Sequence, residues 1–81
     1  MATNYFTFGC GQTFKDHYVI IEAKDDNRCR ELMIEAFGTR WSMQYDKEPD
    51  GKYGEKPLVH ICEMETGAKI VHVLPAEIHH L

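Results

Sequence analysis

One stretch of the chain carries the apolar repeat of a helix, and this limits the possible folds more than any other feature. Asp25, Asp26 and Asn27 offer capping oxygens and negative charge where such a helix begins. Gly38 suits the position just after its last turn. The apolar positions follow the spacing i, i+3, i+4, i+7 and i+8, and they are Cys29, Leu32, Met33, Ala36 and Phe37.

The segments around this helix have the character of strands. Tyr5–Phe8 is extended and stops at the breaker Gly9-Cys10-Gly11. His17–Glu22 is almost continuously apolar and β-branched, which predicts a central strand with both faces largely covered. Trp41–Tyr45 alternates, with Trp41, Met43 and Tyr45 predicted on one side of a short third strand.

A hairpin is the clearest signal in the second half of the chain. Leu58–Met64 and Ala68–Leu74 are joined by Glu65-Thr66-Gly67, a three-residue turn with glycine at the left-handed position. The predicted register places Glu63 opposite Lys69, which is a favourable charge pair. It also places Ile61 opposite Val71, Val59 opposite Val73 and His60 opposite His72.

These elements predict an α+β fold: a small antiparallel or mixed sheet of about five strands, in the chain order β-β-α-β-β-β, with one helix packed on one face. Residues 1–81 are expected to form a single domain, with a mobile loop at 46–57 and a tail at 75–81. The charged residues of the helix are interpreted as a solvated face, and they are Arg28, Arg30, Glu31 and Glu35.

Composition limits the class of function. The 13 acidic residues exceed the 9 Lys and Arg and give a net charge of −4, which argues against a protein that binds the nucleic-acid backbone. Three widely spaced cysteines, without a signal peptide or an apolar membrane span, predict a protein of the reducing cytosol. No catalytic motif is present, and Cys10 lacks a positioned base, so we expect no enzyme, no catalytic residue and no cofactor.

Two groups of residues are candidates for binding. In the first, glycines let the backbone approach a ligand, tryptophan offers a stacking face, and glutamine and arginine offer polar handles, as in a nucleotide pocket. This predicted ligand set is Gly9, Gly11, Gln12, Arg40, Trp41 and Gln44. The alternative is that the aromatic residues simply form the core, which we favour for Phe6 and Trp41.

The second group lies on one predicted face of the hairpin. His60, Cys62, His72 and Leu74 form a candidate self-association or partner surface if the helix covers the other face of the sheet. Leu58, Met64 and Ile70 are predicted on the same face. The alternatives are that the long loop and the tail cover this face, or that His60, Cys62 and His72 hold zinc. We expect no metal, because zinc sites usually have tighter, paired spacings.

Four short patterns resemble small, mostly uncharacterised proteins encoded by bacteriophages and prophages. They are F-T-F-G-x-G-Q at 6–12, Y-V-x-I-E at 18–22, R-E-x-M-x-E-x-F-G at 30–38 and W-x-x-Q-Y-D at 41–46. The resemblance implies a phage accessory protein in the host cytosol that acts by binding. The expected function is counter-defence, by sequestering a nucleotide signal or by blocking a host defence protein. The alternative is a structural or regulatory phage protein that forms oligomers.

Overall fold

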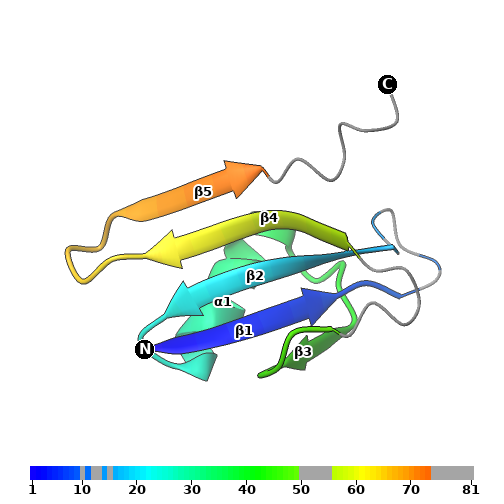
Figure 1. The fold of residues 1–81 in the computed structure, drawn as a ribbon, viewed down its shortest axis with the longest axis horizontal. Coiled ribbons are helices and arrows are strands. Elements are labelled where there is room, and N and C mark those ends of the chain that lie inside the picture. The colour runs from blue at the N-terminus through cyan, green and yellow to red at the C-terminus, as the bar shows by residue number, and fades with distance from the viewer. Residues whose placement is uncertain (10, 12–13, 15, 50–55, 74–81) are drawn as a thin grey trace.

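The computed structural model describes residues 1–9, 11, 14, 16–49 and 56–73. A five-stranded mixed sheet has α1 packed on one face, so the predicted α+β fold and its chain order are confirmed (Figure 1). The elements are β1 (Ala2–Thr7), β2 (His17–Ala23), α1 (Asp26–Phe37), β3 (Met43–Tyr45), β4 (Lys56–Glu63) and β5 (Lys69–Val73).

The strands lie in the order β3-β1-β2-β4-β5. β1 pairs antiparallel with both β2 and β3, β4 pairs antiparallel with β5, and β2 and β4 run parallel. A parallel pair requires a long connection between its strands, and here that connection includes α1 and β3. The predicted central strand is confirmed, because β2 lies in the middle of the sheet.

Both predicted ends of the helix are confirmed. Asp25 Oδ1 accepts a hydrogen bond of 2.7 Å from the backbone N–H of Arg28, which caps the first turn. Gly38 has φ of +65°, and its N–H donates to the carbonyl oxygen of Ile34 at 2.7 Å. The predicted apolar stripe is wrong at one position, since Ala36 is exposed.

The core lies between α1 and strands β1, β2 and β4. Side chains alternate along a strand, so Phe6 and Phe8 of the β1 segment point to the helix, as do Val19 and Ile21 of β2. The buried apolar cluster consists of Phe6, Phe8, Val19, Ile21, Ala23, Cys29, Leu32, Met33, Leu58 and Ile61. The core interpretation is confirmed for Phe6, whereas Tyr45 is 43% exposed and is not a core residue.

The hairpin has the predicted register, with Glu63 opposite Lys69 and His60 opposite His72. Gly67 has φ of +86°, in the region that favours glycine, and its N–H donates to the carbonyl oxygen of Met64 at 2.9 Å. The sequence therefore predicted both the turn and the pairing of β4 with β5.

The bounds of several predicted strands change, and β1 begins at Ala2, three residues before its predicted start. β3 begins at Met43, after Trp41, and β4 begins at Lys56, two residues before the predicted start. The β2–β4 register shifts between Tyr18 and Val19, which turns Leu58 into the core instead of toward the face that carries His60. Leu74 and the tail 75–81 lie outside the described residues, as do residues 50–55 of the predicted loop.

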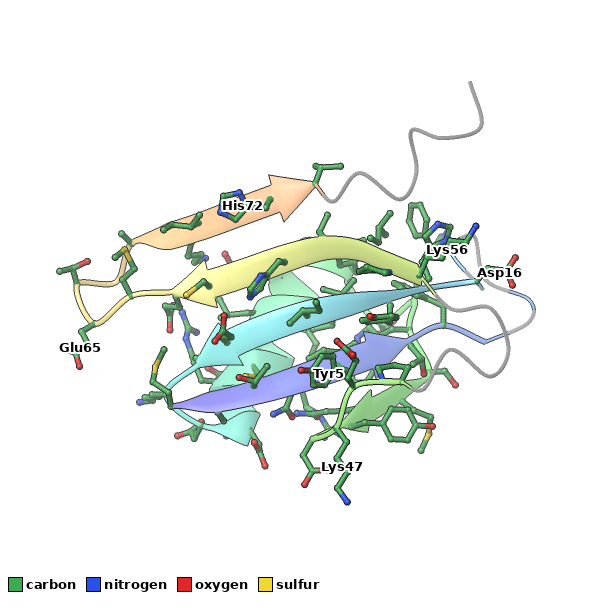
Figure 2. All side chains as sticks on the ribbon, viewed as in Figure 1. Tyr5, Asp16, Lys47, Lys56, Glu65 and His72 are labelled. Atoms are coloured by element: carbon green, nitrogen blue, oxygen red, sulfur yellow. The ribbon has the colours of Figure 1, made fainter. Side chains whose placement is uncertain are left out.

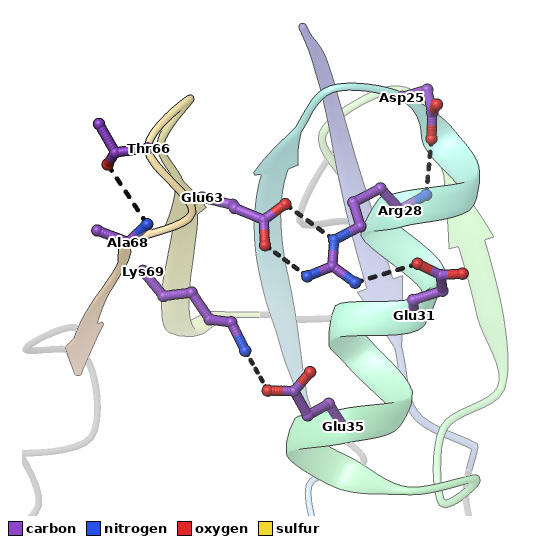
Figure 3. A network of polar contacts seen from close by, with 8 residues as sticks. All are labelled: Asp25, Arg28, Glu31, Glu35, Glu63, Thr66, Ala68 and Lys69. Carbon is purple, nitrogen blue, oxygen red and sulfur yellow. Dashed lines mark hydrogen bonds and ion pairs between the residues drawn. The ribbon is translucent and has the colours of Figure 1, made fainter.

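The charged side of α1 is largely exposed, as the sequence predicted, but two of its residues also bind the hairpin. Figure 3 shows Arg28 and Glu35 turned toward the hairpin, where Arg28 binds Glu63 and Glu35 accepts a hydrogen bond from Lys69. These residues join the helix to β4 and to the start of β5. Among the residues that the structure describes, α1 is the only helix, and it is too short and too polar to cross a membrane.

Candidate functional site

An open pocket of about 630 Å³ lies where β3 meets β1 and the first turns of α1. The helix supplies polar and charged side chains, while β3 and the residues just before it supply aromatic and amide groups. The lining residues are Asn4, Asp26, Asn27, Arg30, Trp41, Ser42, Met43, Gln44, Tyr45 and Asp46.

A chain of amide hydrogen bonds forms the floor of this pocket. Asn4 is only 2% exposed, and its Nδ2 donates to Asp26 Oδ1 at 2.9 Å. Gln44 Nε2 donates to Asn4 Oδ1 and, at 3.0 Å, to the carbonyl oxygen of Asp26. A buried amide is costly without partners, so these contacts explain why β1, β3 and the start of α1 are held together here.

Arg30 and Trp41 form one wall. The Arg30 guanidinium carbon lies 5.7 Å from the centre of the Trp41 ring, within cation–π range, and Arg30 Nε donates to Gln44 Oε1 at 3.1 Å. The indole N–H donates to the carbonyl oxygen of Gly38 at 3.0 Å, and the ring packs edge-to-face on Phe6 with centroids 5.1 Å apart. Trp41 is therefore a fixed aromatic surface and not a freely rotating side chain.

The charges around the pocket are unequal. Asp26 and Asp46 contribute two carboxylates against the single guanidinium of Arg30. A phosphate group placed in the pocket would meet two negative charges, whereas the N–H donors of a nucleobase would meet acceptors. The lining thus suits a planar, neutral group with several N–H donors.

The structure brings together two members of the predicted ligand set, Trp41 and Gln44, which both line the pocket. Arg40 is exposed and is not among the lining residues, and neither are Gly9 and Gly11. Gln12 lies outside the described residues.

Among the lining residues outside the predicted ligand set are Asn4, Asp26 and Arg30, which make the polar contacts of the floor and the wall. A signal for Asn4 was present, because it stands two residues before Phe6 and shares its inward-facing side of β1. A polar residue in an inward-facing series indicates a buried hydrogen-bonding role. Arg30 had no comparable signal, since its contact with Trp41 joins α1 to the segment before β3.

The second candidate surface lies on the face of the sheet away from α1. Figure 2 shows Tyr5 and His72 on this face, and strand alternation places His60 and Cys62 there too. His60 Nε2 lies 2.6 Å from Glu22 Oε2 and sits opposite His72. In the described ranges 1–9, 11, 14, 16–49 and 56–73, no three His, Cys, Asp or Glu side chains are grouped to hold a metal ion.

Ionic contacts hold the hairpin to the helix (Figure 3). Arg28 Nε and Nη2 donate to the two carboxylate oxygens of Glu63 at 2.8 and 2.6 Å. These bonds raise the pKa of Arg28 and lower the pKa of Glu63. Lys69 Nζ pairs with Glu35, about two turns after Arg28 along the helix.

Cys29 has the environment of a structural thiol. It is fully buried, and its Sγ lies 3.4 Å from the carbonyl oxygen of Ile21. Burial raises the pKa of Cys29 to about 11, so the thiol stays neutral and unreactive near neutral pH. Cys10, considered as a nucleophile in the sequence analysis, lies outside the described residues.

The pocket and the exposed hairpin are the features from which a function is inferred. No protein-family model matches this chain, and no curated protein or solved structure shows significant similarity to it.

Proposed function

We propose that this chain is a non-enzymatic accessory protein of the bacteriophage type, which inhibits host defence in the host cytosol by capturing a nucleotide signal. The observation that carries the proposal is the convergence of Trp41, Arg30, Gln44 and Asn4 on one open pocket. An aromatic face beside amide and guanidinium groups is the chemistry that stacks on a base and reads its edge. Capture of this kind needs no catalytic group.

The size of the pocket supports a ligand of nucleoside dimensions. Its volume of about 630 Å³ falls within the roughly 300–1,000 Å³ that is usual for small-molecule sites. The wall formed by Trp41 and Arg30 is held in place by bonds to Gly38 and Gln44. A pre-organised wall reduces the entropy lost on binding.

The charge of the pocket determines which end of the nucleotide enters it. Asp26 and Asp46 disfavour phosphate inside the pocket, so the base enters and the phosphate groups remain in solvent. We therefore expect the base, and not the phosphate, to supply most of the affinity. A nucleoside and its 5′-monophosphate should bind within about threefold of each other.

Isothermal titration with adenosine, guanosine, cytidine, uridine and their 5′-monophosphates tests the proposal. We expect at least one base to bind with 1:1 stoichiometry per chain. Native mass spectrometry of protein expressed beside a nucleotide-signalling defence system should show a retained nucleotide mass. If no nucleoside or nucleotide binds at millimolar concentration and no mass is retained, the proposal is wrong.

A matched pair of arginine variants shows whether the pocket is the site. Arg30→Ala removes the guanidinium that lines it and should weaken binding by about tenfold or more. Arg40→Ala removes an exposed guanidinium outside the lining and should change binding by less than about twofold. Equal losses from the two variants would place the ligand elsewhere.

A second candidate function is a structural or regulatory phage protein that works as an oligomer. The observation in its favour is a group of large apolar side chains exposed on the β4–β5 hairpin: Met64, Ile70, Val71 and Val73. Exposed apolar patches on small domains mark contacts with other chains. Assembly without nucleotide binding in the titrations above would favour this candidate.

A further inference from the structure

β5 leaves one edge of the sheet unpaired in the described part of the chain. It is the last strand in the order, and it carries exposed apolar side chains on both faces: Ile70 is 39% exposed, Val71 58% and Val73 71%. Such an edge is a template for another strand. The opposite edge differs, because β3 has only three residues to offer a partner.

The hairpin ladder determines which backbone groups of β5 point outward. The N–H of Met64 donates to the carbonyl oxygen of Ala68 at 2.7 Å, so these two residues form a hydrogen-bonded pair. Such pairs alternate with non-bonded pairs along an antiparallel ladder, whose register here has no shift. The residues of β5 whose N–H and C=O groups point away from β4 are therefore Lys69, Val71 and Val73.

We propose that β5 pairs with β5 of a second copy of this chain, antiparallel and centred on Val71, so that two sheets join across a two-fold axis. In this register Val71 faces its own counterpart, and Lys69 faces Val73 of the second copy. All outward-pointing backbone groups of the strand then meet one another in hydrogen-bonded pairs. A two-fold contact of this kind closes on itself and does not form filaments.

The side chains of β5 fit this register. Val71 and Val73 continue the helix-side surface across the axis, and on the other face Ile70 lies opposite His72 of the second copy. Lys69, the strand's permanent charge, is already paired with Glu35 and does not face another lysine. The partner that fits this edge is a second copy of the chain, because β5 is complementary to itself in this register.

Sedimentation velocity of the full chain tests the pairing. We expect a monomer–dimer equilibrium with a Kd of about 5–500 µM, since a contact made by one short strand is small. Val71→Lys and Val71→Glu each place like charges opposite each other, so each variant should raise the dimer Kd by about tenfold or more. Because position 71 faces itself, an equimolar mixture of the two variants should recover a heterodimer.

The matched control is Ile34→Lys, which changes an exposed apolar residue on α1, away from β5. It should leave the dimer Kd unchanged. Circular dichroism and thermal melting check that each variant is folded before its dimer Kd is compared with that of the wild type. A wild-type chain that stays monomeric, a dimer that survives both single variants at position 71, or a mixture that fails to associate would each overturn the proposal.

Discussion

The two halves of the sheet are stabilised by different forces. Around β1 and β2 the helix contributes Cys29, Leu32 and Met33 to a buried apolar cluster. Around β4 and β5 the helix contributes charged groups instead, and large apolar side chains of the hairpin stay exposed. The first half therefore holds most of the apolar core, whereas the second half leaves large apolar side chains exposed.

This difference follows from geometry. A single helix of 12 residues is about 10–12 Å wide with its side chains, whereas five strands spaced about 4.8 Å apart form a wider sheet. α1 lies over β1 and β2 and leaves the outer side of the hairpin uncovered. Long charged side chains such as Arg28 then span the remaining distance to β4.

The largest expected difference between the halves is in truncation of apolar residues. Phe6→Ala removes a fully buried ring that packs on Trp41, and we expect it to lower the free energy of unfolding by about 3–5 kcal/mol. Val73→Ala, on the exposed hairpin edge, should lower it by less than about 1 kcal/mol. Urea unfolding followed by Trp41 fluorescence or circular dichroism measures both, and similar losses would contradict the comparison.

A smaller effect is expected from the polar floor of the pocket, which belongs to the first half. Gln44→Ala leaves the buried Asn4 oxygen without its Gln44 partner, so the free energy of unfolding should fall by about 1–3 kcal/mol. Gln44→Glu is the informative companion, because a carboxylate cannot donate to Asn4 Oδ1 and should not restore stability. Full stability in both variants would show that Asn4 finds another partner.

The smallest effect concerns the ionic contact of the second half and appears in its pH dependence. Arg28 lowers the pKa of Glu63 below its ordinary 4.5, so the folded state binds a proton there less readily than the unfolded chain does. The resulting stabilisation is present above that ordinary pKa and is lost as the pH falls through the lowered one. Thermal melting should show Glu63→Gln less stable than wild type at about pH 7, with the difference in melting temperature closing at about pH 2.

Glu31→Gln serves as the control for this measurement. Glu31 also contacts Arg28, but on the exposed side of the guanidinium and through a single bond of 3.1 Å. Its effect on the melting temperature should be smaller than that of Glu63→Gln at every pH. A constant gap between wild type and Glu63→Gln across the acid range would mean that the ion pair does not stabilise the fold.

Local patterns predicted most of the fold. The caps at Asp25 and Gly38, the glycine turn at Gly67 and the register of the hairpin all depend on residues close in sequence, and each is confirmed. The errors occur where distant segments meet. Leu58 turned into the core because of a register shift against β2, and Ala36 is exposed although its spacing matches the apolar stripe.

The candidate pocket was predicted less completely for the same reason. Trp41 and Gln44 were identified by their chemistry, but Asn4 and Arg30 reach them from β1 and α1. Sequence spacing carries no information on which helix side chain lies over which strand. The ion pair of Arg28 with Glu63 was missed for the same reason, since Glu63 is 35 residues away.

The amino-acid sequence by itself determined the elements, the two ends of the helix and the hairpin pairing, because capping, turn conformation and side-chain alternation operate over a few residues. Only the tertiary structure decided the strand order, the half of the sheet that α1 covers, the pocket beside Trp41 and the exposed edge of β5. These features depend on the width of one helix relative to five strands and on contacts between segments far apart in the chain. Such contacts form only once the whole sheet is assembled.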